Sequence, residues 1–174
     1  MMGINKRNLS ILLATILGSS FLLTASWGSS GDAVFAAVTH GPTKEECSAC
    51  HMAYPAGLLP ARSWKKMMGE LDRHFGEDAS LAPEVASDIA KYLTENAADI
   101  PRGTQMMSRI ASGIPGNSDP QRFTETRYFG YLHDEVPAYV WKRKGIASKA
   151  NCTACHTKAD QGSFIEREIK IPKQ

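Results

Sequence analysis

Two copies of one short motif use all four cysteines of this 174-residue chain. The first copy is Cys47-Ser48-Ala49-Cys50-His51 and the second is Cys152-Thr153-Ala154-Cys155-His156. A histidine directly after a C-x-x-C pair is the signature of c-type haem attachment, in which two thiols add to the porphyrin vinyl groups and the histidine binds the iron. The sequence therefore predicts two covalently attached haem c groups, with His51 and His156 as axial ligands of the irons.

Three other kinds of site also use C-x-x-C pairs. A zinc site can be built from two such pairs, but it does not require a histidine after each of them. A structural disulfide framework is a second alternative. A pair of redox dithiols is a third, although no βαβ pattern surrounds either motif. The histidine that completes both motifs favours haem over these alternatives.

The N-terminus has the pattern of a secretory leader. Lys6 and Arg7 precede an uncharged stretch, residues 8–30, whose apolar core is residues 9–23. Val34-Phe35-Ala36 offers a small-residue cleavage site before Ala37. We therefore expect residues 1–36 to be a signal peptide and the protein to be periplasmic. An uncleaved anchor is the alternative, because the apolar run is near the lower limit for a membrane span, and only then do we expect membrane contact.

The remaining sequence indicates a small, mainly α fold with two haem-binding lobes. We expect an N-terminal lobe over residues 37–105, an irregular connection over 106–120 and a C-terminal lobe over 121–174. Apolar spacing predicts a helix over 61–75 that carries His74 and ends at Gly76, and a second helix that starts near Pro83. The expected buried stripe of that second helix is Val85, Ile89, Tyr92, Leu93 and Ala97. One helical turn at 106–110 and short helices near 137–144 and 152–158 complete the expectation.

Each haem iron has a sixth coordination position, and three further histidines could fill it. His74 shares a predicted apolar helix face, and His133 lies between an aromatic cluster and Trp141, so both are predicted distal ligands. His40 lies beside Gly41-Pro42 in an expected flexible tail and is interpreted as solvated. Methionine is the rival ligand: Met106 or Met107 follows the first motif at a distance typical of class I cytochromes c.

Much of the mature sequence resembles the small bacterial dihaem cytochromes c known as DHC. The residues that carry the resemblance surround both motifs and both predicted distal histidines. They are residues 46–55, 58–64, His74-Phe75-Gly76, Tyr92-Leu93, Asn96-Ala97-Ala98, Phe123-Thr124-Glu125-Thr126, His133, Trp141-Lys142-Arg143, Ala150-Asn151-Cys152 and 159–164. Ala56 stands where the family pattern suggests a second proline, and residues 38–44 and 101–120 match poorly.

The resemblance implies an exported electron carrier with two bis-histidine haems, whose distal ligands map to His74 and His133. It implies a redox partner protein, either a high-spin monohaem cytochrome c or a membrane cytochrome. Two six-coordinate irons leave no open site for a substrate, so an enzyme is not expected. A dihaem redox enzyme or a gas-binding sensor with one displaceable ligand is the alternative.

Charge excludes one class of partner and suggests another. The formal charge of +2 falls to +1 without Lys6, Arg7 and Asp32, and four ionised haem propionates would bring the mature protein to roughly −3. No strongly basic domain or known motif indicates nucleic-acid binding. Basic residues still outnumber acidic ones by seven to three between Gln121 and Lys158. We expect Lys142-Arg143-Lys144 to steer an acidic partner.

Overall fold

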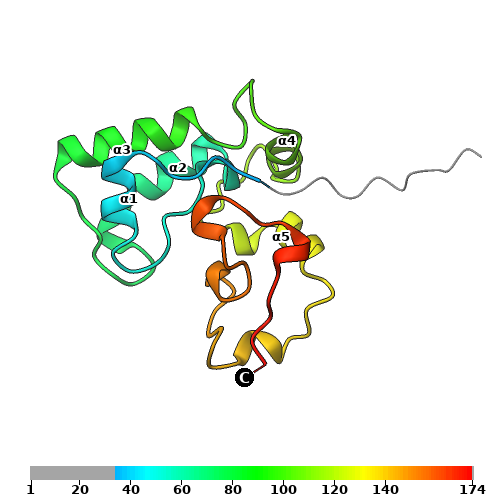
Figure 1. Cartoon of the computed structure of the whole chain (residues 1–174). Helices are drawn as coiled ribbons and strands as arrows, with labels where there is room; N and C mark the ends of the chain where they lie inside the picture. The colour runs from blue at the N-terminus through cyan, green and yellow to red at the C-terminus, as the bar shows by residue number, and fades with distance from the viewer. Residues whose placement is uncertain (1–33, 174) are drawn as a thin grey trace, which may run out of the picture. The chain divides into compact units, whose positions relative to one another are not determined.

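Short helices joined by turns make up the computed structural model, which describes residues 34–173 (Figure 1). The α-helices are α1 (Gly41–Cys47), α2 (Ala61–Met68), α3 (Pro83–Glu95), α4 (Gln105–Ser112) and α5 (Arg127–Leu132). Within the described residues, β structure is limited to three isolated bridges. The predicted mainly α class is therefore confirmed. No helix within residues 34–173 is long and apolar enough to cross a membrane.

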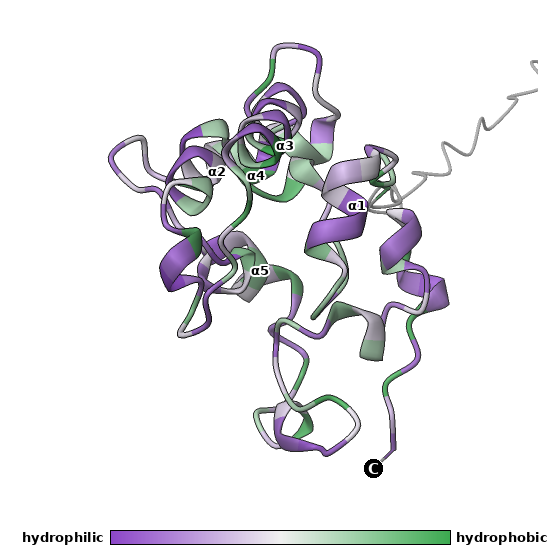
Figure 2. Ribbon diagram, turned by 90° about the vertical axis from the view of Figure 1, so that its left-hand side faces the viewer, coloured by the Kyte–Doolittle hydropathy of each residue, from purple (hydrophilic) through white to green (hydrophobic). Residues whose placement is uncertain are grey.

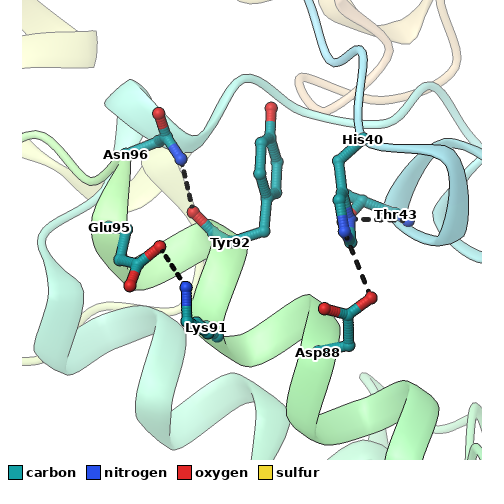
Figure 3. Close-up of polar contacts among 7 residues, drawn as sticks. All are labelled: His40, Thr43, Asp88, Lys91, Tyr92, Glu95 and Asn96. Carbon is teal, nitrogen blue, oxygen red and sulfur yellow. Dashed lines mark hydrogen bonds and ion pairs between the residues drawn. The ribbon is translucent and has the colours of Figure 1, made fainter.

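Helix α1 ends at Cys47, the first cysteine of the first motif, and His40 caps the start of the helix. The His40 imidazole is the N-cap of α1, with Nδ1 2.8 Å from Thr43 Oγ1, while Nε2 lies 3.2 Å from an Asp88 carboxylate oxygen. The same ring stacks on Tyr92 of α3 with centroids 4.7 Å apart (Figure 3). The expectation of a solvated His40 in a flexible tail is therefore wrong, because these contacts bind it to α1 and α3.

Helices α2 and α3 pack against each other around one hydrophobic cluster. The predicted stripe is largely confirmed: Ile89 and Leu93 of α3 are buried in one cluster with Trp64 of α2. Ala97, just after α3, is buried there too, and Val85 and Tyr92 are partly buried against the cluster. The Trp64 indole N–H donates to the Ala56 carbonyl at 2.8 Å, so its burial leaves no polar group unpaired. Figure 2 shows hydrophilic and hydrophobic residues on these helices, as expected for amphipathic elements.

The predicted helix over residues 61–75 ends earlier than expected. Gly69 is its C-cap, and the Gly69 N–H donates to backbone carbonyls of the last turn. A separate 3-10 helix, η2 (Leu71–Arg73), follows, and His74 comes directly after it. Gly76 has φ +107° and forms part of a turn rather than a helix end. His74 therefore lies in a turn and not on the apolar face of α2.

The segment expected to be an irregular connection is half helical. Thr104 caps α4 by accepting a hydrogen bond from Met107 N–H at 3.2 Å. Met107 and Ile110 enter a second hydrophobic cluster with Phe35, Leu58, Ala98 and Ile114, against which Tyr128 and Phe164 pack. Apolar burial of this kind overrides the high glycine and proline content. The two predicted lobes thus share a core that draws residues from both.

The C-terminal region is built mostly from 3-10 turns. Helix α5, which we did not predict, is capped by Thr126 and ends at His133. The helices predicted near 137–144 and 152–158 are reduced to η4 (Val140–Lys142) and η5 (Cys152–Ala154). Two further turns, η6 (Ala159–Gln161) and η7 (Glu166–Glu168), follow.

The folded region starts before the predicted leader boundary. Phe35 is only 6% exposed and Val38 only 7%, so both side chains belong to the core. A cut before Ala37 would remove the first of them. The rest of the predicted leader lies outside the described residues, and its cleavage stays a prediction.

Candidate functional site

The first cysteine motif lies beside a pair of histidines. The His51 ring and the His74 ring are 6.1 Å apart between centroids, with an angle of 28° between their planes. His51 Nδ1 lies 2.8 Å from the Met52 carbonyl oxygen. A carbonyl oxygen can only accept, so Nδ1 carries the proton and Nε2 keeps its lone pair for a metal. This is the usual orientation of a metal-binding histidine.

A tight turn presents His74 to His51. Phe75 has φ +56° and Gly76 φ +107°, and the Glu77 N–H donates to the His74 carbonyl at 3.1 Å. The Arg122 guanidinium lies 3.8 Å from the Phe75 ring centre, a cation–π contact that supports the strained residue. Burial lowers the pKa of His74, and the nearby His51 and Arg122 lower it further. The neutral imidazole that a metal requires is therefore favoured.

The second cysteine motif lies beside a second histidine pair. The rings of His133 and His156 are also 6.1 Å apart, with their planes at 79°. His133 ends α5, where Nδ1 lies 3.0 Å from the Phe129 carbonyl, again leaving Nε2 for a metal. The Phe129 ring stacks on His133 at 4.1 Å, and the Trp141 ring centre is 5.8 Å away. The aromatic surroundings predicted for His133 are thus present.

His156 carries one buried nitrogen without a hydrogen-bond partner among the described residues. This atom is Nδ1. Burial lowers the pKa of His156 and of His133, which favours the neutral imidazole that a metal requires. A buried, unpaired imidazole nitrogen is costly unless another group completes it. The ring of Phe164 lies 5.2 Å from His156 and helps to close this side of the site.

Both histidine pairs have the spacing that one metal between two imidazoles requires. A metal–imidazole bond is about 2 Å long, so two rings on opposite sides of one metal have centres about 6 Å apart. The four motif cysteines are unpaired and flank these pairs in sequence. The residues therefore fit two haem groups: Cys47 and Cys50 would hold one, and Cys152 and Cys155 the other.

The alternative cysteine chemistries lack support in the described region. No three or more His, Cys, Asp or Glu side chains converge within residues 34–173, as a zinc site would need. Burial raises the pKa of Cys47 and Cys155 and raises that of Cys152 to about 11. A redox dithiol needs a thiol of low pKa, so these thiols do not suit that role.

The rival axial ligands have other contacts. Met107 is buried in the core, and Met106 Sδ accepts a hydrogen bond from Tyr128 Oη at 3.0 Å. Both ring nitrogens of His40 face protein groups, Thr43 and Asp88.

Tyr54 joins the two halves of the site, and our sequence interpretation gave it no role. Its ring centre lies 4.9 Å from that of His51, and its hydroxyl donates to the Ala150 carbonyl at 2.6 Å. Ala150 is two residues before Cys152. Burial raises the pKa of Tyr54 to about 12, so the hydroxyl stays protonated as a donor. A lone tyrosine three residues after a motif carries no sequence signal for such a contact.

The comparison with known proteins decides what these paired sites belong to. Residues 43–164 match the dihaem cytochrome c family. The chain belongs to this family. A diheme cytochrome c from Rhodobacter sphaeroides is 45% identical, with a TM-score of 0.67, over 74% of this chain and 99% of that one. A diheme cytochrome type c from Shewanella baltica OS155 is 34% identical, with a TM-score of 0.62, over 76% of this chain and 93% of that one. No match was found among curated proteins.

Family membership confirms the predicted cofactors and general role. This dihaem cytochrome c carries two haem groups and is a haem electron-transfer protein. All four cysteines needed for covalent attachment are present in its two motifs.

Proposed function

We propose that this protein is a periplasmic electron carrier that works through two bis-histidine haems and is not an enzyme. One observation carries the proposal: each cysteine motif has a second histidine with its ring 6.1 Å from the motif histidine. His51 and His74 would bind one iron, and His133 and His156 the other. These four side chains would leave neither iron an open site for a substrate.

The haem groups supply the one-electron chemistry, and the protein residues set its conditions. Backbone hydrogen bonds to Nδ1 of His51 and His133 fix the ring orientation and increase the basicity of Nε2. Phe129, Trp141 and Phe164 limit water around the second pair. Histidine pairs should give lower potentials than a histidine–methionine pair. The four histidines would thus hold both irons in fixed coordination during one-electron transfer.

Spectroscopy of the haem-loaded protein tests this proposal. Electron paramagnetic resonance should show two low-spin ferric haems, and the optical spectrum should lack a methionine–iron charge-transfer band. Carbon monoxide added to the reduced protein should leave the spectrum unchanged. Rapid carbon monoxide binding at one haem would instead support the enzyme or sensor alternative.

Export is the second part of the proposal. The charged and apolar pattern of residues 6–23 supports a secretory leader, as does the need to mature c-type haems outside the cytoplasm. Cell fractionation should recover the haem protein in the periplasm. Recovery in the cytoplasm would contradict export.

A redox partner should dock near the second haem. An open pocket of about 430 Å³ borders His133 and is lined by Trp141, Lys142 and Lys149 among others. Lys142 and Lys144 are exposed, whereas Arg143 donates to the Pro172 carbonyl at 2.6 Å and is held within the protein. The two exposed lysines therefore support steering of an acidic partner, either a monohaem cytochrome c or a membrane cytochrome.

A further inference from the structure

Residues 34–38, the N-terminal strap, lie against the segment that follows the second cysteine motif. Val34 forms an antiparallel bridge with Ser163, and Phe35 N–H donates to the Gly162 carbonyl at 2.8 Å. The Phe35 ring meets the Phe164 ring edge to face, with centroids 5.6 Å apart. Phe164 in turn lies 5.2 Å from His156. A continuous series of contacts therefore leads from the strap to the second motif histidine.

The strap passes so close to Gly162 that no side chain fits at this position. Its φ of +81° is unfavourable for other residues, and a Cβ at this position would lie 2.3 Å from the Phe35 carbonyl oxygen. That oxygen belongs to the backbone and cannot move without moving the strap. Glycine is therefore required here for two separate reasons, the positive φ and the close approach of the strap.

Phe35 also packs on the opposite side, against the shared core. It belongs to the cluster that contains Met107 and Ile110, and a Cβ on Gly57 would lie 3.0 Å from its ring. A protein that began at Ala37 would lose this ring and leave a cavity between η1 (Ala56–Leu58), α4 and Phe164.

We infer that the leader is cut before Val34 and that Phe35 is a positioning residue for His156, acting through Phe164. Gly31-Asp32-Ala33 supplies the small residues that a leader peptidase needs at the third and first positions before such a cut. The inference rests on the proposed export and on the proposed ligation of the second iron by His156. It changes the predicted boundary from residue 36 to residue 33 and adds a residue to the second haem site.

Intact-mass measurement of the exported haem protein tests the position of the cut. The expected mass is that of a chain from Val34 with two haems. A mass lower by Val34, Phe35 and Ala36 would overturn the inference while leaving export intact. A full-length chain with its leader attached would overturn the cut before Val34, and its retention in the membrane would separately contradict the proposed periplasmic carrier.

Two matched pairs of variants test the positioning role. Phe35→Ala should shift the midpoint potential and the paramagnetic signal of the second haem, and leave those of the first unchanged. Ile110→Ala is its control: Ile110 is fully buried in the same cluster, so it should reduce stability without changing either potential. Equal shifts in both variants, or no shift in Phe35→Ala, would overturn the positioning role.

The second pair tests the strap from the other side. Gly162→Ala should push the strap away and shift the second haem in the same direction as Phe35→Ala. Gly116→Ala is the control, because nothing lies within 4 Å of a Cβ there and its φ is not positive. A Gly162→Ala protein with an unchanged second haem would show that His156 does not depend on the strap.

Discussion

At the scale of single residues, the site depends on where each histidine directs its two nitrogens. In His51 and His133, Nδ1 meets a backbone carbonyl and Nε2 is left for iron. His40 faces Thr43 with one nitrogen and Asp88 with the other, so it holds α1 on α3 instead (Figure 3). The proposed ligands and the structural histidine therefore differ in the partners of their ring nitrogens.

Removing a distal histidine should open one iron. In His74→Ala we expect a high-spin signal from one haem and an unchanged low-spin signal from the other, because the proximal histidine alone leaves iron five-coordinate. Added imidazole should restore the low-spin signal. His40→Ala is the control and should leave both haems low-spin. A high-spin signal in His40→Ala but not in His74→Ala would reverse the assignment.

The Tyr54 hydroxyl should contribute stability that depends on pH. Its pKa of about 12 exceeds the value near 10 expected in the unfolded chain, so the contribution is complete below about pH 10 and is lost as pH rises towards 12. Tyr54→Phe should cost about 1 kcal/mol at pH 8 through loss of the bond to Ala150. Urea unfolding between pH 8 and 11 should show this difference narrowing above pH 10. Tyr139→Phe, at an exposed tyrosine, should show no such difference.

At the scale of elements, sequence periodicity predicted α3 well and α2 less well. Ile89 and Leu93 repeat at helical spacing on a helix long enough for the pattern to be read. Past Gly69 the same spacing continues to His74, but the chain turns, because a helix end depends on cap geometry that apolar spacing does not encode. The sequence predicted which histidines lie together, His51 with His74 and His133 with His156, because the haem motif and its candidate ligands are recognised by residue type. Binding of iron by these histidines stays a prediction. The contacts of Phe35 and Tyr54 were not predictable, because their partners lie more than 90 residues away.

The cap of α4 offers a test at this scale. Thr104→Ala should lower the free energy of unfolding by about 1 kcal/mol, because the Met107 N–H loses its acceptor. Chemical denaturation of the haem-loaded protein measures the change. Thr104→Ser keeps the hydroxyl and should lie close to the parent protein. Equal losses in both variants would mean that the threonine methyl group, and not the cap, is responsible.

At the scale of the whole molecule, charge is distributed unevenly. Four ionised propionates would make the mature holoprotein acidic overall. Exposed Lys142 lines the pocket that borders His133, and exposed Lys144 lies two residues further along the chain. A local patch of opposite sign raises association rates with an acidic partner and weakens as salt increases.

Electron transfer to the natural partner should therefore slow as ionic strength rises. The double change Lys142→Glu and Lys144→Glu should slow it further at low salt and leave both haem spectra unchanged. Stopped-flow measurement of the reaction at several salt concentrations gives both effects. The control is Lys91→Glu, a charge reversal at an exposed lysine that pairs with Glu95 on α3, and it should change the rate much less. If neither salt nor the double change at Lys142 and Lys144 alters the rate, these lysines have no role in docking.

The bridge between Val34 and Ser163 also sets the order in which the molecule can be made. These residues are 129 positions apart (163 − 34), so in the proposed export the strap would have nowhere to dock until nearly the whole chain had crossed the membrane. If the N-terminus crosses first in that export, Cys47 and Cys50 would emerge long before this closure is possible. The haem-attaching enzymes would therefore meet an open chain, and the late arrival of the last dozen residues would allow the protein to close over cofactors already in place.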